Sequence, residues 1–294
     1  MEYVAGMVRV WLDTDIGSDV DDAVALLCAI RHPEIELVGV STVFEWVTAR
    51  AWLAKEMLKR AGLGQAPVLP GATTPVGGEP RTVAPGSYGL LAPQGPPDDP
   101  GEDEARVLAI AREMESVEGA FHLLTVGALT NAALLLQLRP GIAAKWSGVT
   151  CMAGRLEGEA EWNVSCDPEG ARSAFAGLSP RLVGLEASSD TLAREEVEAL
   201  LDPRDAASAF LRDCYRCYRE AGWHQDPETA PLTLFDAITL LSLVREEAFD
   251  FRAVRVRMEP GGGLRLDEEG IPVTYAFSSD WSVLKPVVCG LLRG

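Results

Sequence analysis

Five aspartates lie within ten residues near the start of the chain, and this group is the strongest chemical signal in the sequence. The acidic segment reads Asp13-Thr14-Asp15-Ile16-Gly17-Ser18-Asp19-Val20-Asp21-Asp22. Carboxylates at such close quarters repel one another and take up protons, unless a hard divalent cation with oxygen ligands neutralises them. The spacing therefore predicts a cation site. The alternative is a solvated acidic loop that caps a helix.

Two other motifs that begin with spaced aspartates match the acidic segment poorly. An EF-hand loop needs Asp or Asn at its fifth position and Glu at its twelfth, but Gly17 and Val24 occupy those positions here. A phosphatase of the haloacid dehalogenase type also begins with a strand and Asp-x-Asp. That pattern continues with Thr or Val where this chain has Gly17, so neither motif is favoured.

The elements around the acidic segment predict where it lies in the fold. Apolar, β-branched runs alternate with helical patterns along most of the chain, as in βα units around a mainly parallel sheet. In such sheets ligands bind beyond the carboxyl ends of the strands, and the acidic segment directly follows the first predicted strand. Strands are predicted at 8–12, 35–43, 121–126, 146–152 and 181–185, and helices at 21–31, 47–61, 131–138 and from Asp167-Pro168-Glu169 onward.

The last third of the chain is mostly helical. Helices are predicted over 206–221 and 234–245, followed by short strands near 254–258 and 273–277 and a last helix. The stretch 67–101 is rich in Pro and Gly without a lasting period, so it is a long excursion rather than a domain linker. We predict an α/β fold in one domain over residues 1–294. It has a single open, mainly parallel sheet of Rossmann-like topology, helices on both faces and a helical C-terminal elaboration.

The composition excludes several classes of protein. The 294 residues are 47% hydrophobic with a mean hydropathy of +0.07, so the chain is neither disordered nor fibrous and has no membrane span. The net charge of −18 repels nucleic acid and anionic membranes, which leaves cations and neutral solutes as ligands. The first residues lack a basic signal peptide, and the six scattered cysteines fit a reducing compartment, so a cytoplasmic protein is predicted.

The acidic segment resembles the opening motif of the inosine-uridine-type nucleoside hydrolases, D-x-D-x-G-x-D-D-A, with two residues inserted before Asp21. Further matches follow in order along the chain. Residues 126–131 resemble the T-G-P-L-T-N turn of that family, and residues 160–163 with 167–169 are similar to its A-E-F-N and D-P-E-A motifs. Residues 234–237, Leu-Phe-Asp-Ala, stand where the family has L-H-D-P or L-H-D-A.

The resemblance implies one Ca²⁺ at the bottom of a pocket. By position its ligands are Asp15, Asp22, Asp236 and the backbone carbonyl of Val126, and such oxygen donors suit this ion. Asp15 would be the general base that activates a metal-bound water for attack on the anomeric carbon of a ribonucleoside. The N-glycosidic bond would break as the ribose gains oxocarbenium character, giving ribose and a free base. Asp13 would orient the loop from behind.

Three further polar residues match positions that hold the sugar in this family. Asp21 resembles the residue that binds the ribose 2′ and 3′ hydroxyls, while Glu161 and Asn163 resemble those that hold the 5′ and neighbouring hydroxyls. Taken alone, Glu161 would be a surface acid and Asn163 a turn residue. Ribosides should be preferred over deoxyribosides, because a deoxy analogue leaves buried polar groups unpaired. Asp19 lies in the insertion and is expected to be only solvated.

The base-binding half of the motif set departs from the family pattern. Phe235 replaces a histidine that assists the leaving base in many members, and Pro85 replaces the histidine of the family's H-G-x-x-G-L segment. Phe44, Trp46, Trp162 and Phe235 would form an aromatic wall that stacks on a base. The alternative for each of these four is ordinary core packing.

A replacement acid must come from a short list, because the chain has only three histidines. His32 follows the first helix and is expected on the surface. His122 lies in a strand, where a histidine is more often a core residue than a catalyst. His224, in the polar loop after the helix 206–221, is the predicted catalytic acid and would close over the pocket as part of a lid.

The sequence thus predicts a Ca²⁺-dependent nucleoside N-ribohydrolase of nucleoside salvage, acting on a small nucleoside or related riboside, with the base preference open. Two alternatives remain: a ribose- or nucleoside-binding protein that is catalytically weak or inactive, and a hydrolase for an unusual N-riboside. The resemblance also implies a homodimer or homotetramer.

Overall fold

A computed structural model of the protein describes residues 6–77, 86, 91–92, 98–201, 205–221 and 231–293. The strands of the main sheet are β1 (Val8–Thr14), β2 (Ile35–Thr42), β3 (Val68–Pro70), β4 (Phe121–Thr125), β5 (Trp146–Met152), β6 (Arg181–Val183), β9 (Phe249–Met258), β10 (Leu264–Leu266) and β11 (Ile271–Ser279). A separate small sheet pairs β7 (Thr191–Leu192) with β8 (Leu232–Thr233).

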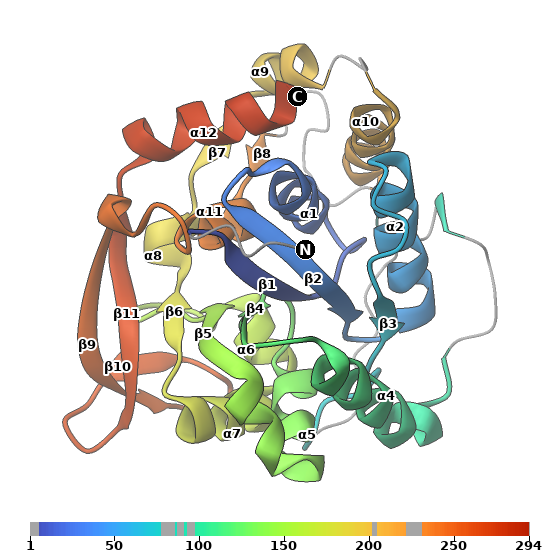
Figure 1. Ribbon diagram of the computed structural model, residues 1–294. Helices are drawn as coiled ribbons and strands as arrows, with labels where there is room; N and C mark the ends of the chain where they lie inside the picture. Colours follow the sequence, from blue (N-terminus) through green and yellow to red (C-terminus); the bar gives the residue numbers. More distant parts are fainter. Residues whose placement is uncertain are drawn as a thin grey trace.

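The main sheet is open and mostly parallel (Figure 1). Within the described residues its order is β10-β9-β11-β6-β5-β4-β1-β2-β3. Pairing is parallel from β3 across to β11. It is antiparallel only where β9 joins β11 and where β10 joins β9. The predicted α/β architecture is therefore confirmed.

Helices cover both faces of this sheet (Figure 1). One face carries α1 (Asp21–Arg31), α2 (Val47–Arg60), α10 (Ala206–Glu220), α11 (Phe235–Leu241) and α12 (Trp281–Arg293). The other face carries α4 (Asp103–Ser116), α5 (Thr130–Leu138) and α7 (Pro168–Leu178). Shorter helices are α6 (Trp162–Cys166), α8 (Leu185–Ser188), α9 (Arg194–Leu200), and the 3₁₀ turns η1 (Pro100–Glu102), η2 (Pro140–Lys145) and η3 (Glu246–Ala248). None of the described helices has the length and apolar character needed to cross a membrane.

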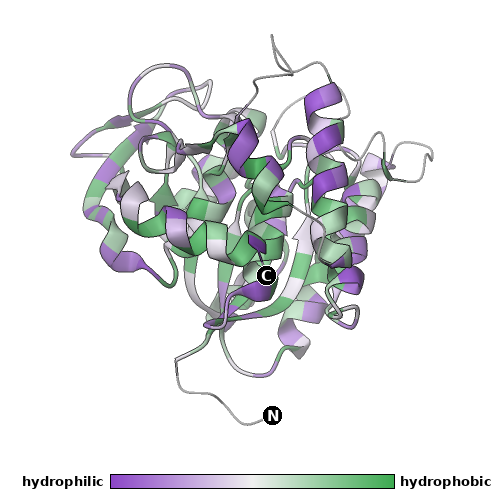
Figure 2. Ribbon diagram, turned by 90° about the horizontal axis from the view of Figure 1, so that it is seen from above, coloured by the Kyte–Doolittle hydropathy of each residue, from purple (hydrophilic) through white to green (hydrophobic). Residues whose placement is uncertain are grey.

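Each face of the sheet has its own hydrophobic core. Successive side chains of a strand point to opposite faces, so Leu12 packs against α1 and α2 while its neighbour Trp11 packs on the other side with Phe121. Figure 2 shows apolar residues where helices face the sheet and hydrophilic residues on their outer turns. The start of α7 is fixed as the sequence predicts, because the Asp167 carboxylate accepts the Gly170 N–H at 2.8 Å.

The strand order places a binding crevice at the centre of the sheet. β1 pairs with β2 on one side and with β4 on the other, so successive strands are added in opposite directions from this point. In such sheets the crevice between the two central strands, at their carboxyl ends, is where ligands bind. At this edge of the sheet, β1 continues into the acidic segment and β4 is followed by Val126.

The C-terminal third differs from the sequence prediction in two elements. The helix predicted over 234–245 ends at Leu241, after which the N–H groups of Leu243 and Val244 donate to the carbonyls three residues earlier, each at 3.1 Å, as in a tighter 3₁₀ turn. The strands predicted near 254–258 and 273–277 are longer, as β9 and β11, and they extend the main sheet.

One residue expected on the surface is instead buried. His32, just after α1, is 3% exposed, and its Nδ1 accepts the backbone N–H of Glu34 at 3.1 Å. Its side chain thus closes the turn between α1 and β2. Its place after a helix, the basis of the surface prediction, gave no sign of this packing.

Candidate active site

A cavity of about 340 Å³ opens at the carboxyl ends of β1, β4 and β5. All four predicted metal ligands line it and are buried: Asp15, Asp22, Val126 and Asp236, which we call the floor. They come from the loop after β1, the start of α1, the residue after β4 and the first turn of α11. The fold therefore brings together oxygen donors from three distant segments of the chain.

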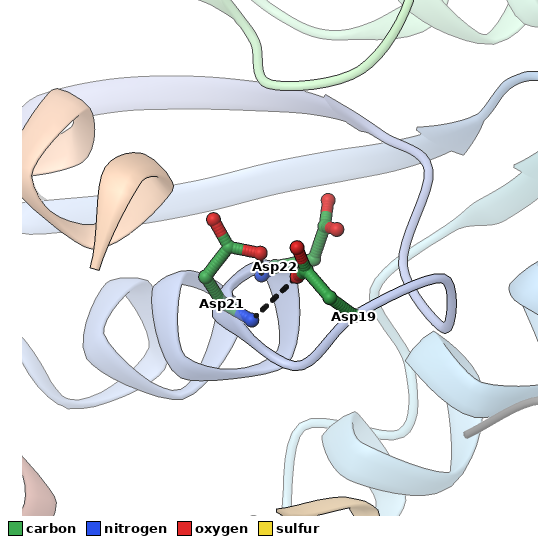
Figure 3. Close-up of side chains that lie close together, drawn as sticks. All are labelled: Asp19, Asp21 and Asp22. Carbon is green, nitrogen blue, oxygen red and sulfur yellow. Dashed lines mark hydrogen bonds between the residues drawn. The ribbon is translucent and has the colours of Figure 1, made fainter. Parts of the chain in front are cut away.

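The loop between β1 and α1 is folded by its own side chains. Thr14 Oγ1 donates a hydrogen bond to the Asp22 carboxylate. Gly17 adopts a φ of +109°, which glycine tolerates at little cost. Asp19 Oδ1 accepts the backbone N–H of Asp21 at 3.1 Å, the dashed line in Figure 3. These contacts turn the chain sharply into α1, so that Asp21 and Asp22 lie in its first turn.

Arg50 on α2 is fully buried and holds the same loop from behind. Its Nη1 donates to the carbonyls of Asp15 and Ile16, its Nη2 to Ser18 Oγ at 2.8 Å, and its Nε to the Phe44 carbonyl at 2.7 Å. The guanidinium also lowers the pKa of Asp15, against the larger effect of burial. Sequence analysis missed this residue, since nothing local marks an arginine in an ordinary helix.

Asp13 lies within β1, buried beneath the loop. Ser41 Oγ and Asn131 Nδ2 donate to its Oδ1, the second at 2.7 Å, and Asn131 also accepts the Ala72 N–H at 2.8 Å. Among the described residues its Oδ2 has no hydrogen-bond partner. Burial raises the pKa of Asp13 to about 7. Its side chain thus joins the end of β1 to β2 and to the first turn of α5, beneath the loop that it was predicted to orient.

Burial raises the pKa of the three floor carboxyls and of Asp21 beside them. The pKa of Asp15 rises to about 6, and those of Asp21, Asp22 and Asp236 rise well above the ordinary value, because burial is reinforced by neighbouring carboxylates. No lysine, arginine or histidine is among the described residues that line the cavity. The Val126 carbonyl adds a neutral oxygen. Such a donor set fits a hard divalent cation, which removes the repulsion.

Asp19 is a cavity residue that sequence analysis placed in solvent. It is only partly exposed and lines the cavity, and one oxygen each from Asp19, Asp21 and Asp22 lie within 4.8 Å of one another. Figure 3 shows these three carboxylates gathered at the start of α1. Of this group, Asp22 alone belongs to the predicted ligand set. The position of Asp19 two residues before α1 could have predicted its place in the cavity, because it places the Asp19 side chain near the first turn of the helix.

The residues predicted to hold the sugar also line the cavity and are buried: Asp21, Glu161 and Asn163. Glu161 caps the N-terminus of α6, since its carboxylate accepts the N–H of Asn163 at 2.6 Å and of Val164 at 3.1 Å. It also accepts the Gly154 N–H at 3.1 Å. Asn163 Nδ2 donates to the Val126 carbonyl at 2.9 Å. Glu161 is therefore no surface acid, and Asn163 is tied directly to the floor.

Apolar side chains that line the cavity include the buried Met152 and three that are at least partly exposed, Trp162, Leu185 and Phe235, which we call the rim. The Trp162 side chain is 46% exposed, and Phe235 is half-buried. Sequence analysis missed Met152 and Leu185. Met152 is the last residue of β5, and Leu185 lies two residues after β6. Because ligands bind at the carboxyl ends of strands in such sheets, this position could have predicted both as cavity residues.

The other two residues of the predicted aromatic wall lie elsewhere. Phe44 is buried in a small cluster with Val43, Ala128 and Cys166. Its φ of +70° turns the chain there, so its side chain packs inward and core packing describes it better. Trp46 is half-buried against the core on the α1 and α2 face. Pro85 and His224 lie outside the described residues.

Comparison with known proteins agrees with this geometry. A family model described as inosine-uridine preferring nucleoside hydrolase matches residues 10–274. The chain is 29% identical to a probable uridine nucleosidase 1 from Oryza sativa subsp. japonica, over 94% of this chain and 89% of that protein. It is 28% identical to uridine nucleosidase 1 from Arabidopsis thaliana, over 94% of this chain and 86% of that protein.

A solved structure supports the same fold. The structure of a purine-preferring ribonucleoside hydrolase from Gardnerella vaginalis has a TM-score of 0.77 and 20% identity, covering 97% of this chain and 99% of that chain. At this identity the likeness shows the fold alone. The family match spans nearly the whole chain and contains the floor and all three predicted sugar-binding residues. The protein is therefore a glycosyl hydrolase and belongs to the inosine-uridine preferring nucleoside hydrolase family.

Proposed function

We propose that the protein hydrolyses the N-glycosidic bond of a ribonucleoside in a Ca²⁺-dependent reaction, giving ribose and a free base. The observation that carries this proposal is the convergence of the floor with Asp21, Glu161 and Asn163 in one cavity. Its volume of about 340 Å³ lies at the lower end of the range of small-molecule sites, roughly 300–1,000 Å³. Family membership supports the reaction class, and the residue roles below are proposals.

Asp15 is the proposed general base. Its carboxylate takes a proton from the attacking water while the water oxygen bonds to the anomeric carbon of the ribose. Burial raises the pKa of Asp15 to about 6 in the protein without a bound cation, so the carboxyl is mostly ionised at neutral pH. Arg50 holds the backbone carbonyl of Asp15, which fixes the carboxylate relative to the floor.

Asp15, Asp22, Asp236 and the Val126 carbonyl would hold the Ca²⁺. These are hard oxygen donors, and no histidine or cysteine lines the described part of the cavity, which favours Ca²⁺ over softer metals. The bound ion supplies positive charge that lowers the pKa of water and attracts vicinal hydroxyls. The Val126 carbonyl already accepts one hydrogen bond from Asn163 and keeps a second lone pair.

The sugar is held by carboxylates and an amide. We assign Asp21 to the 2′ and 3′ hydroxyls, and Glu161 and Asn163 to the 5′ and neighbouring hydroxyls. Glu161 Oε2 accepts two backbone N–H groups, whereas Oε1 accepts one and keeps a lone pair for a substrate hydroxyl. The negative charge around the ribose stabilises the oxocarbenium character that develops as the bond to the base breaks.

The leaving base lacks an evident proton donor in the described lining. Phe235 stands at the rim and carries no N–H or O–H group that reaches a base. His224 stays the proposed acid, in the segment that follows α10. A second candidate function rests on the same observation: without a working acid, the protein would bind ribosides and turn them over weakly.

Three organisational predictions accompany this proposal. They are a single domain over residues 1–294, assembly as a homodimer or homotetramer, and a location in the cytoplasm. The domain prediction rests on the periodic pattern of the whole chain, the assembly on the family resemblance, and the location on the scattered cysteines.

The test is ribose release from a panel of purine and pyrimidine ribonucleosides, with Ca²⁺ or with EDTA. Asp15→Asn removes the base while keeping its size, and Glu118→Gln changes an exposed carboxylate in the turn before β4, at the opposite edge of the sheet. We expect release by wild-type protein and Glu118→Gln that EDTA abolishes, and none by Asp15→Asn. Ca²⁺-dependent riboside binding without release from any nucleoside would favour the binding protein instead.

A further inference from the structure

We propose that Gly127 is a positioning residue of the hydrolase, because the absence of a side chain there sets the spacing between the Asp15 carboxylate and the Val126 carbonyl. The inference rests on the proposed function, since Asp15 is the general base proposed there and both groups belong to the floor. Two features carry it: the contacts that a side chain at position 127 would make, and the way in which the two groups are otherwise held.

Gly127 is buried where the turn after β4 passes the end of β1. A Cβ atom on Gly127 would lie 2.9 Å from the backbone nitrogen of Asp15, 3.0 Å from Asp15 Oδ1 and 2.8 Å from Val43 Cγ1. Ordinary contacts of a Cβ atom are 3.4–4 Å long. The Asp15 nitrogen belongs to the main chain and cannot turn aside, so an added methyl group must displace Asp15 or the turn itself.

The need for glycine comes from this close approach and not from the backbone conformation. Gly17 and Gly154 have a positive φ, which favours glycine, whereas Gly127 does not. The φ of Gly127 is therefore open to alanine. The methyl group of an alanine would meet Asp15 and Val43, so a substitution at this position tests those contacts.

The hydrogen bonds on either side of Gly127 hold main-chain groups. The Val126 carbonyl accepts from Asn163 Nδ2 at 2.9 Å, and Arg50 Nη1 donates to the Asp15 carbonyl. Neither bond sets the side-chain torsions of Asp15. Gly127 lies directly beside the Asp15 carboxylate and limits how it can turn. The chain thus places a residue without a side chain between the two floor groups that must keep a fixed separation.

This separation matters for both proposed roles of Asp15. A general base must lie within hydrogen-bond reach of the attacking water, and groups that bind one cation must share one geometry. To restore ordinary contact, a methyl group at position 127 must move Asp15 by about 0.5 Å, which is as large as the tolerance of a preorganised site. The proposed sugar-binding residues are not among the nearest neighbours of that methyl group.

The test compares Gly127→Ala with Gly141→Ala, a matched glycine substitution. Gly141 is exposed in η2, and a Cβ atom there would have no neighbour within 4 Å among the described residues. kcat and KM are measured for uridine and inosine at saturating Ca²⁺. The affinity for Ca²⁺ is measured separately by titration calorimetry without nucleoside, and thermal melts in EDTA report the stability of each variant.

We expect Gly127→Ala to lower kcat about ten- to 100-fold and to weaken Ca²⁺ binding by a similar factor, as the loss of groups that orient a metal ligand does. KM should stay within about three-fold of the wild-type value, because the residues proposed to hold the sugar are not displaced. Gly141→Ala should match wild type in all three quantities. A purely structural role for Gly127 would lower the melting temperature in EDTA and leave kcat and Ca²⁺ affinity of the folded protein unchanged.

A double variant separates the contact with Asp15 from the contact with Val43. Val43→Ala combined with Gly127→Ala removes the nearest neighbour of the added methyl group and leaves Asp15 unchanged. We expect it to melt close to Val43→Ala alone and to keep the low kcat and the weak Ca²⁺ binding. Recovery of both quantities to the level of Val43→Ala would show that the effect passes through Val43, and would overturn the inference.

Wild-type kcat and Ca²⁺ affinity in Gly127→Ala would also overturn the inference and leave the hydrolase intact. Absence of ribose release from every nucleoside by wild type would overturn the proposed function instead, and the Ca²⁺ affinity of Gly127→Ala would still test the spacing of the floor. A wild-type protein that neither binds Ca²⁺ nor releases ribose would overturn both.

Discussion

The floor and the rim of the cavity are built in different ways. The floor residues are buried, and contacts from behind fix their loop, above all the Thr14 hydroxyl and the Arg50 guanidinium. The rim side chain Trp162 is nearly half exposed, and Phe235 is half-buried. A change on the floor disturbs several buried hydrogen bonds, whereas a change at the rim disturbs few.

This contrast separates two parts of the proposed reaction. Bond breaking depends on groups that the fold holds rigidly at the crevice between β1 and β4. Selection of the base depends on side chains that can be exchanged with little effect on folding. A family can therefore retain one chemistry and change its substrates at the rim.

Asp236→Asn should separate stability from function on the floor. We expect kcat/KM to fall about 1,000-fold or more, because a charged ligand beside the reacting atoms is lost. In EDTA the variant should melt at a higher temperature than wild type, since burial and the neighbouring carboxylates of Asp22, Asp19 and Asp15 make its ionised form unfavourable.

Thermal melts with and without Ca²⁺ measure both effects of Asp236→Asn. Wild type should be stabilised by Ca²⁺, because the ion binds the folded state, and the variant much less. Glu118→Gln should behave as wild type. A variant that keeps the full Ca²⁺-dependent shift would show that Asp236 is not a ligand.

Arg50→Met tests whether the floor depends on its support from behind. The change leaves three carbonyls and the Ser18 hydroxyl without their buried donor, so we expect a loss of about 3–5 kcal/mol in the free energy of unfolding. Urea denaturation measures it. Lys59→Met on the same helix, whose side chain is 74% exposed, should cost less than about 1 kcal/mol.

The conservative variant Arg50→Lys keeps the charge but not the fork of donors. We expect an intermediate loss of stability and a weaker affinity for Ca²⁺. A stability equal to wild type in both Arg50 variants would mean that the loop supports itself through Thr14 and Gly17 alone.

The same contrast explains what the sequence could predict. The floor residues could be predicted because they follow strands or open helices: Asp15 comes after β1, Val126 after β4, and Asp236 lies in the first turn of α11. The parallel sheet then forces carboxyl ends together. The sheet itself was predictable for the same reason, from short apolar runs that alternate with helical patterns.

Other features depend on tertiary packing that no local pattern encodes. In the sequence, Arg50 is an ordinary helix residue. Its role is visible only once α2 is placed behind the acidic segment. In the sequence, Phe44 could stack on a base. In the structure it has a positive φ and its side chain packs in the interior. The exposure of Trp162 depends on how α6 sits at the end of β5. Such features require the relative placement of elements far apart in the chain.

Trp162→Ala is the corresponding test at the rim. Loss of stacking should raise KM for ribosides with aromatic bases about ten-fold or more, as one base–aromatic stack is worth about 1–3 kcal/mol. The free energy of unfolding should change by less than about 1 kcal/mol, since the side chain is 46% exposed. Leu266→Ala, an exposed residue in β10, is the control. A stability loss as large as that of Arg50→Met would erase the distinction between floor and rim.

The smallest effect is a gain that depends on the leaving base. Phe235→His places a proton donor at the rim, and we expect kcat for inosine and uridine to rise about three- to ten-fold, well below the 10²–10⁴ of an optimised acid. Only the protonated imidazole donates, so the gain should be present at pH 6 and fade as the pH rises through about 6.5, the ordinary histidine pKa. Phe235→Leu, which removes the ring without adding a donor, should show no gain. Nicotinamide riboside should not benefit, because its base leaves without a proton. An equal gain on charged and neutral ribosides would place the added histidine in sugar binding, and would show that the rim takes part in bond breaking after all.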